Sequence, residues 1–124
     1  AYSGYTSGAK KSATKSNQAA ITKYIAAELQ KCNLGETKAM GGNLTCKNMT
    51  GATVVTAAVT ALADFKNPYA TSDNAVVKSG TYTTDGSAGI TGVSASGSTI
   101  TIGTCIEEKC SVTAHQQKNT VLVE

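Results

Sequence analysis

Apolar residues recur at helical spacing in the first quarter of the chain. Ile21, Ile25 and Leu29 are each one helical turn apart, and no proline or glycine interrupts residues 9–32. Apolar positions that recur in this way form one buried stripe on a helix surface. The pattern predicts a long helix within residues 1–32.

The first half of this predicted helix is polar. Up to Gln18 it consists mainly of Ala, Ser, Thr and Lys, so only Ala9 and Ala13 are available to contact a core. We therefore expect this half to protrude from the domain or to be covered by another molecule. The helix should end at residues 33–35, because a glycine just after a helix commonly adopts the left-handed stop conformation.

A shorter apolar run with helical spacing lies further along the chain. Val55, Val59 and Leu62 recur at three- and four-residue steps within residues 52–65, which favours a second helix that packs through one face. A strand is the alternative, since β-branched residues are common in strands. Pro68 ends the element in either case, because the residue before a proline avoids helical backbone angles.

The last part of the chain contains short runs that are typical of β-strands. Residues 99–102 alternate threonine with isoleucine, which gives a strand one buried face and one exposed face. Ser96 and Gly97 are expected to form a tight hairpin turn before this strand. The predicted strands are 75–78, 89–95, 98–106, 111–114 and 120–123.

Helices precede strands along the chain, and this order is typical of α+β domains. A chain of 124 residues is long enough to bury one core. We therefore predict one α+β domain over residues 1–124. The helix within 1–32 packs on an antiparallel sheet of about four strands from residues 75–124, and residues 33–74 form a connecting loop that contains the second short helix.

Four cysteines form an even set, and even sets in small exported domains usually pair as disulfides. A zinc site made of four cysteines needs two tight pairs, whereas thirteen residues separate Cys32 from Cys46. The predicted pairing is local, Cys32 with Cys46 and Cys105 with Cys110, and the crossed connectivities remain open. Each bridge would contribute about 2–3 kcal/mol on the chain-entropy model, which suits a core with no Trp and one Phe.

Positive charge is concentrated near the start of the chain. The net charge is +3, and all eleven basic residues are lysines, so the bidentate arginine contacts that read phosphate or guanine are absent. We interpret the lysines as a solvated helix face, with a nucleic-acid footprint as the alternative. The first 32 residues contain one acidic residue, Glu28, and five lysines, which are Lys10, Lys11, Lys15, Lys23 and Lys31.

Catalytic chemistry has little support in the sequence. His115 is the one histidine and lies in a polar run, so any triad would depend on it. Gly86, Gly89 and Gly92 lack the spacing of a phosphate-binding loop, and the acidic residues lack the alternation of a calcium-binding loop. We predict no catalytic residue, no cofactor and no metal ligand, with calcium held by separate loops as an alternative.

The chain opens at Ala1 without a methionine or a hydrophobic targeting segment, and no run approaches the ~20 apolar residues of a membrane span. Paired cysteines are typical of compartments outside the reducing cytosol. We therefore expect an exported structural protein that is processed or truncated.

Tyr2 and Tyr5 precede the Ala/Lys/Ser-rich start of the predicted helix, and Cys105 and Cys110 lie late in the predicted sheet. In these features the chain resembles the globular portion of a bacterial type IV pilin. In that family a hydrophobic N-terminal stem runs into a Pro-x-Tyr-x-x-Tyr-like junction, where Tyr2 and Tyr5 match the tyrosines. A C-terminal cysteine pair staples the sheet, and the pair in this chain matches it in order and place.

The resemblance implies a structural subunit that polymerises through its N-terminal helix into a homo-oligomeric pilus. Such a filament supports surface adherence, motility or DNA uptake outside the cell, and the hydrophobic stem, absent here, anchors the subunit in the inner membrane before assembly. The resemblance places assembly contacts at Tyr2, Tyr5, Ala9 and Ala13, and it implies no catalytic residue.

Two further interpretations remain. A pseudopilin of a type II secretion system has the same architecture, but such subunits often lack the late cysteine pair. A free secreted binding or adhesion module would have the same disulfides without a hydrophobic stem in its gene. A hydrolase that depends on His115 ranks after both.

Overall fold

The computed structural model describes residues 6–78 and 82–124 of the chain. The long N-terminal helix predicted from the sequence is present as α1, Ser7–Asn33. The Thr6 side chain accepts a hydrogen bond from the backbone N–H of Ala9 at 3.2 Å, which satisfies one of the free donors at the start of the helix. After the helix, Gly35 has a φ of +101°, in the left-handed region that glycine adopts without strain.

Along the chain, one helix and two small hairpins follow α1 and precede the main sheet. The second helix, α2, spans Gly51–Ala61, so the prediction of a helix within residues 52–65 is confirmed. Thr50 and Thr53 form a reciprocal capping box at its start. The hairpins consist of β1 (Lys38–Ala39) with β2 (Leu44–Thr45), joined through the 3₁₀ turn η1 (Met40–Gly42), and of β3 (Lys66–Asn67) with β4 (Ala70–Asn74).

The main sheet has four strands in the order β5-β6-β7-β8. The strands are β5 (Val76–Val77), β6 (Thr91–Ser96), β7 (Thr99–Cys105) and β8 (Gln116–Leu122). The prediction of a fully antiparallel sheet is wrong at one edge, because β5 pairs with β6 in parallel. The connection over residues 78–90 gives the chain the length that a parallel pairing needs.

Three local predictions about the sheet region need correction. Residues 111–114 do not form a strand, since the 3₁₀ turn η2 (Thr113–His115) occupies their end. The last strand begins at Gln116 and not at residue 120, because an exposed edge strand is held by its hydrogen bonds to β7 and needs no apolar side chains. Ser96 pairs with Thr99, so the two turn residues are Gly97 and Ser98.

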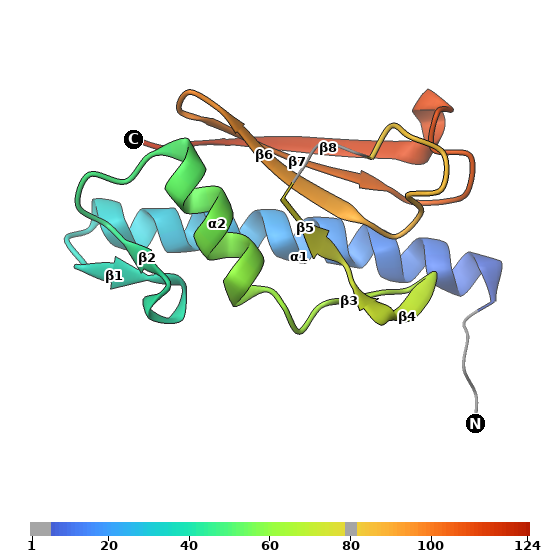
Figure 1. Cartoon of the computed structure of the whole chain (residues 1–124), viewed down its shortest axis with the longest axis horizontal. Helices are drawn as coiled ribbons and strands as arrows, with labels where there is room; N and C mark the ends of the chain where they lie inside the picture. Colours follow the sequence, from blue (N-terminus) through green and yellow to red (C-terminus); the bar gives the residue numbers. More distant parts are fainter. Residues whose placement is uncertain (1–5, 79–81) are drawn as a thin grey trace.

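Both helices cover the same face of the main sheet, as Figure 1 shows. Along β6 and β7 every second side chain points towards the helices, and the opposite face of these two strands carries the hydroxyl side chains of Ser94, Ser96, Thr99 and Thr101. The core is one cluster that joins both helices to the central strands. Its members include Ile21, Ile25, Leu29, Val54, Val55, Ala58, Val93, Ile100 and Ile102.

The polar first half of α1 does not protrude, contrary to the expectation from its composition. Gln18 is 2% exposed, and its Nε2 donates to the carbonyl oxygen of Ile102 and to Oδ1 of Asn119, each at 2.8 Å. The hydroxyl of Thr104 donates to Gln18 Oε1, and it lies 2.8 Å from the hydroxyl of Thr91. This half of the helix therefore packs on the sheet through hydrogen bonds between polar groups and not through apolar contacts. We call these five residues the Gln18 network.

Candidate functional site

Both predicted disulfides are present, and the local pairing is confirmed. Cys32 bonds to Cys46 with their Cα atoms 5.2 Å apart, and Cys105 bonds to Cys110 with a separation of 5.5 Å. The first bridge ties the end of α1 to the segment after β2, and the second closes residues 105–110, which we call the disulfide loop. Two disulfides indicate an oxidising environment outside the cytosol.

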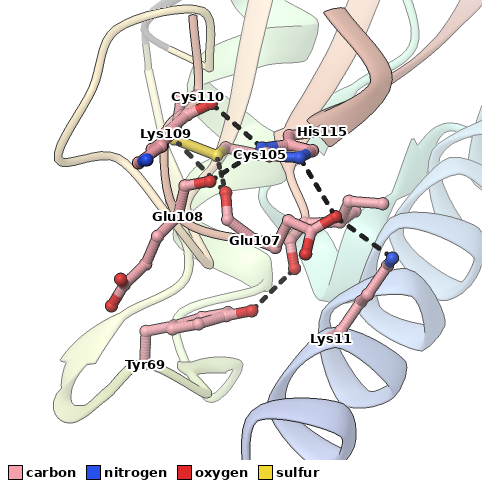
Figure 2. Close-up of polar contacts among 9 residues, drawn as sticks. Lys11, Tyr69, Cys105, Glu107, Glu108, Lys109, Cys110 and His115 are labelled. Atoms are coloured by element: carbon pink, nitrogen blue, oxygen red, sulfur yellow. Dashed lines mark hydrogen bonds and ion pairs between the residues drawn. A yellow bond between two sulfur atoms is a disulfide. The ribbon is translucent and has the colours of Figure 1, made fainter. Parts of the chain in front are cut away.

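The disulfide loop lies beside the first turns of α1 (Figure 2). Glu107 Oε1 is 3.1 Å from Lys11 Nζ and 3.3 Å from His115 Nε2. The hydrogen bond from Lys11 lowers the pKa of Glu107, burial opposes this shift, and the charges of His115, Lys11 and Lys15 add to the lowering. We call Lys11, Glu107 and His115 the Glu107 junction. It connects α1, the disulfide loop and η2.

His115 has a positioning role in this loop. Its Nδ1 lies 2.7 Å from the carbonyl oxygen of Glu108 and 3.1 Å from that of Lys109. The side chain is 23% exposed, so the ring is largely covered although it lies in a polar run of the sequence. Both ring nitrogens face these loop groups, and no hydroxyl hydrogen-bonded to the ring is found among residues 6–78 and 82–124. The arrangement gives no support to a catalytic triad.

Tyr69 contacts the disulfide loop as well. Its hydroxyl donates to the carbonyl oxygen of Ile106 at 2.8 Å, and Lys10 Nζ lies 5.5 Å from the ring centroid, within the range of a cation–π contact. Burial raises the pKa of Tyr69, and the charges of Glu107 and Glu108 raise it further.

A polar cleft of about 470 Å³ opens beside Tyr69. Asp85 lines this cleft and accepts a hydrogen bond from the backbone N–H of Ser111 at 2.8 Å, which lowers the pKa of that carboxyl. The cleft carries charges of both signs. Its charged lining residues are Lys10, Asp73, Asp85, Glu108 and Lys109.

Two of the four predicted assembly residues lie on the described part of α1. Tyr2 and Tyr5 lie outside the described residues. Ala9 and Ala13 are both half-buried on α1, so each retains exposed surface. The role predicted for these residues stays a prediction.

The outward face of α1 consists mainly of small residues. Lys15 and Lys23 are the exposed lysines in the middle of this helix. Small side chains leave the backbone accessible to a close neighbour, because the distance between packed helices depends on the side chains at the contact. After the first turn, the exposed small residues are Ser12, Ser16, Ala19, Ala20, Ala26 and Ala27.

The basic character of α1 is partly neutralised within the fold. Lys11 pairs with Glu107, and Lys31 pairs with Glu28 at 2.8 Å. Lys10 lies over the ring of Tyr69. Three of the five N-terminal lysines therefore have partners in the fold, and the structure adds no support to a nucleic-acid interface.

Sequence reasoning missed the residues that fix α1 to the sheet and to the disulfide loop. Gln18 and Thr104 are 86 positions apart, and Lys11 reaches Glu107 from the other end of the chain. No local spacing connects such pairs. The available signal was the polar glutamine at a position in helical register with Ile21 and Ile25.

Comparisons with models of known protein families, with curated proteins and with solved structures give no match. Among the helices in residues 6–78 and 82–124, none is both long and apolar enough to cross a membrane. Within the same residues no three His, Cys, Asp or Glu side chains are grouped to hold a metal ion.

Proposed function

We propose that this chain is the globular part of a filament-forming structural subunit of the type IV pilin kind. The observation that carries the proposal is the two-sided α1 helix. Its inner face is fixed to a disulfide-stapled sheet by the Gln18 network, and its outer face presents small residues from Ser12 to Ala27. A rigid domain with one such helix face suits close packing against copies of itself.

In this proposal the early part of α1 makes the assembly contacts. Ala9 and Ala13 retain exposed surface for a neighbour, and Tyr2 and Tyr5 precede them in the sequence. The filament lies outside the cell and supports adherence, motility or DNA uptake, and a hydrophobic stem holds the subunit in the inner membrane before assembly. The two disulfides support an extracytoplasmic location, and the subunit performs no catalysis.

Substitutions on the outward face of α1 test this proposal. Ala19→Glu and Ala26→Glu each place a longer, charged side chain on an exposed position, so the isolated domain should keep its circular dichroism spectrum and its unfolding midpoint. We expect surface filaments, counted by electron microscopy on the producing cells, to be lost or strongly reduced.

Ala63→Glu is the matched control, because Ala63 is an exposed alanine outside α1. It should leave the number of filaments unchanged. Normal filaments from both α1 variants would contradict assembly through this helix.

A pseudopilin of a type II secretion system is the nearest alternative, and the Cys105–Cys110 bridge favours the pilin. The polar cleft beside Tyr69 favours a second alternative, a free secreted binding module, because a cleft of about 470 Å³ has the size of a small-molecule site. The coding sequence upstream of Ala1 distinguishes a filament subunit, whether pilin or pseudopilin, from a free binding module. About 25 apolar codons with an early glutamate support a filament subunit, since this length matches a membrane span, and a cleavable signal peptide alone supports the binding module.

A further inference from the structure

The Glu107 junction joins three segments that are distant in the sequence. One carboxylate oxygen, Glu107 Oε1, contacts both Lys11 on α1 and His115 in η2 (Figure 2). A backbone hydrogen bond also joins the disulfide loop to η2, because the N–H of Ile106 donates to the carbonyl oxygen of His115 at 2.8 Å. Any change in the charge of His115 therefore acts where the disulfide loop meets the helix.

The neighbours of His115 fix the position of its first proton. Nδ1 faces the carbonyl oxygens of Glu108 and Lys109, and a carbonyl oxygen only accepts hydrogen bonds. Nδ1 therefore carries a proton in both charge states of the ring. In the neutral ring Nε2 then presents a lone pair to the carboxylate of Glu107, whereas the protonated ring presents an N–H and a positive charge.

The other charges around the ring are of both signs. Lys11 and Lys15 approach Glu107 from α1, and the carboxyl of Glu107 faces the ring from the disulfide loop. Glu108 and Lys109 follow in that loop and bring one further charge of each sign. Lysine and glutamate side chains ordinarily keep their charges between pH 5 and 8, and histidine is the side-chain type that changes charge in this range.

We propose that the Glu107 junction is an acid-tightened clamp between the disulfide loop and α1. Protonation of His115 Nε2 converts its contact with Glu107 from two facing lone pairs into a hydrogen-bonded ion pair, while Lys11 holds the other side of the same carboxylate. The clamp is a property of the single chain, so it stands or falls independently of filament assembly.

A double-mutant cycle at two pH values tests the clamp. The variants are His115→Asn, which keeps a donor near Nδ1 and removes Nε2, Glu107→Gln, and the combination of both. Denaturant unfolding of the oxidised proteins is measured at about pH 5.5 and about pH 8, on either side of the change in histidine charge. We expect the pair to be coupled favourably by roughly two- to fivefold in the unfolding equilibrium constant at the lower pH, as for a partly exposed ion pair. This favourable coupling should disappear at the higher pH, where Nε2 presents a lone pair to the carboxylate.

Glu108→Gln is the matched control, because it removes the adjacent carboxylate and leaves Glu107 in contact with the ring. In this background the pH-dependent coupling should persist. Hydrogen exchange at the Ile106 amide gives a local measurement: after correction for the intrinsic rate, protection should increase on acidification in the wild type and not in His115→Asn. Equal coupling at both pH values, or no coupling at either, would overturn the clamp.

Discussion

At the scale of single residues, buried polar groups determine where α1 lies on the sheet. The amide of Gln18 is hydrogen-bonded to a backbone carbonyl, to Asn119 and to Thr104, so both ends of the amide are satisfied. Apolar contacts tolerate sliding, whereas these bonds hold in one position of the helix. The network therefore defines the register of α1 against β7 and β8.

Replacing Gln18 should expose the importance of this network. In Gln18→Ala the Ile102 carbonyl oxygen and the Thr104 hydroxyl lose a buried partner, and a small cavity forms. We expect the free energy of unfolding to fall by about 2–4 kcal/mol in urea denaturation. Gln30→Ala, at an exposed position of the same helix, should change it by less than about 0.5 kcal/mol. Equal effects of the two changes would show that the network does not fix the helix.

Glu28 is a second buried polar residue on α1. It is 7% exposed, accepts a hydrogen bond from the backbone N–H of Met40, and pairs with Lys31. Burial by itself raises the pKa of Glu28, but the hydrogen bonds from Lys31 and Met40 and the charge of Lys31 outweigh it, so the pKa lies below its ordinary value. Met40 has a φ of +54°, and Glu28 helps to hold it in this unfavourable conformation.

The lowered pKa of Glu28 predicts a loss of stability in acid. The carboxylate binds a proton less readily in the folded chain than in the unfolded chain, where glutamate titrates near pH 4.3. Its contribution is therefore complete above about pH 4.3 and disappears as the pH falls through the lower folded value. Thermal unfolding of Glu28→Gln should show a lower midpoint than the wild type at pH 7 and a much smaller difference near pH 3. Glu36→Gln, an exposed glutamate after the helix, should match the wild type at pH 7.

At the scale of elements, the two disulfides have different surroundings. Cys105 and Cys110 are fully buried, whereas Cys32 and Cys46 are both partly exposed. Thiol–disulfide exchange requires a thiolate to reach a sulfur atom. The bridge at the end of α1 is therefore the accessible one.

Mild reduction of the folded protein should open the bridges in order. We expect a low concentration of dithiothreitol to reduce Cys32–Cys46 first, detected by alkylation and peptide mass spectrometry, while Cys105–Cys110 stays oxidised until the chain unfolds. In denaturant this order should disappear, because burial then protects neither bridge. Earlier reduction of Cys105–Cys110 in the folded state would contradict the role of burial.

At the scale of the whole molecule, one core connects all the larger elements. Apolar residues of α1, α2, β6 and β7 belong to a single buried cluster. A domain of this size with one core unfolds as a unit. Far-ultraviolet circular dichroism and tyrosine fluorescence, the natural probe in a chain without Trp, should therefore give coincident denaturant transitions. Separate midpoints would indicate that the hairpins or α2 unfold independently.

The sequence was informative where a signal is local. The period of Ile21, Ile25 and Leu29 predicted α1, and the even cysteine count with local spacing predicted both bridges. A strand was predicted at residues 75–78, where β5 lies, but its parallel pairing was not. The short hairpins were missed and the start of β8 was misplaced, because two-residue strands carry no period and edge strands need no apolar side chains. Gln18 and Glu107 could not be predicted as contacts, since their partners lie far along the chain.

The distance in sequence between α1 and its partners also affects synthesis. Gln18 bonds to residues that follow it by 84 to 101 positions, so the ribosome makes the helix long before Ile102, Thr104 and Asn119 exist. A helix whose first half were apolar would expose a sticky surface during this interval. Because the inward positions of this half are Thr14 and Gln18, the nascent helix stays hydrated there. It docks on the sheet only when β7 and β8 have been made.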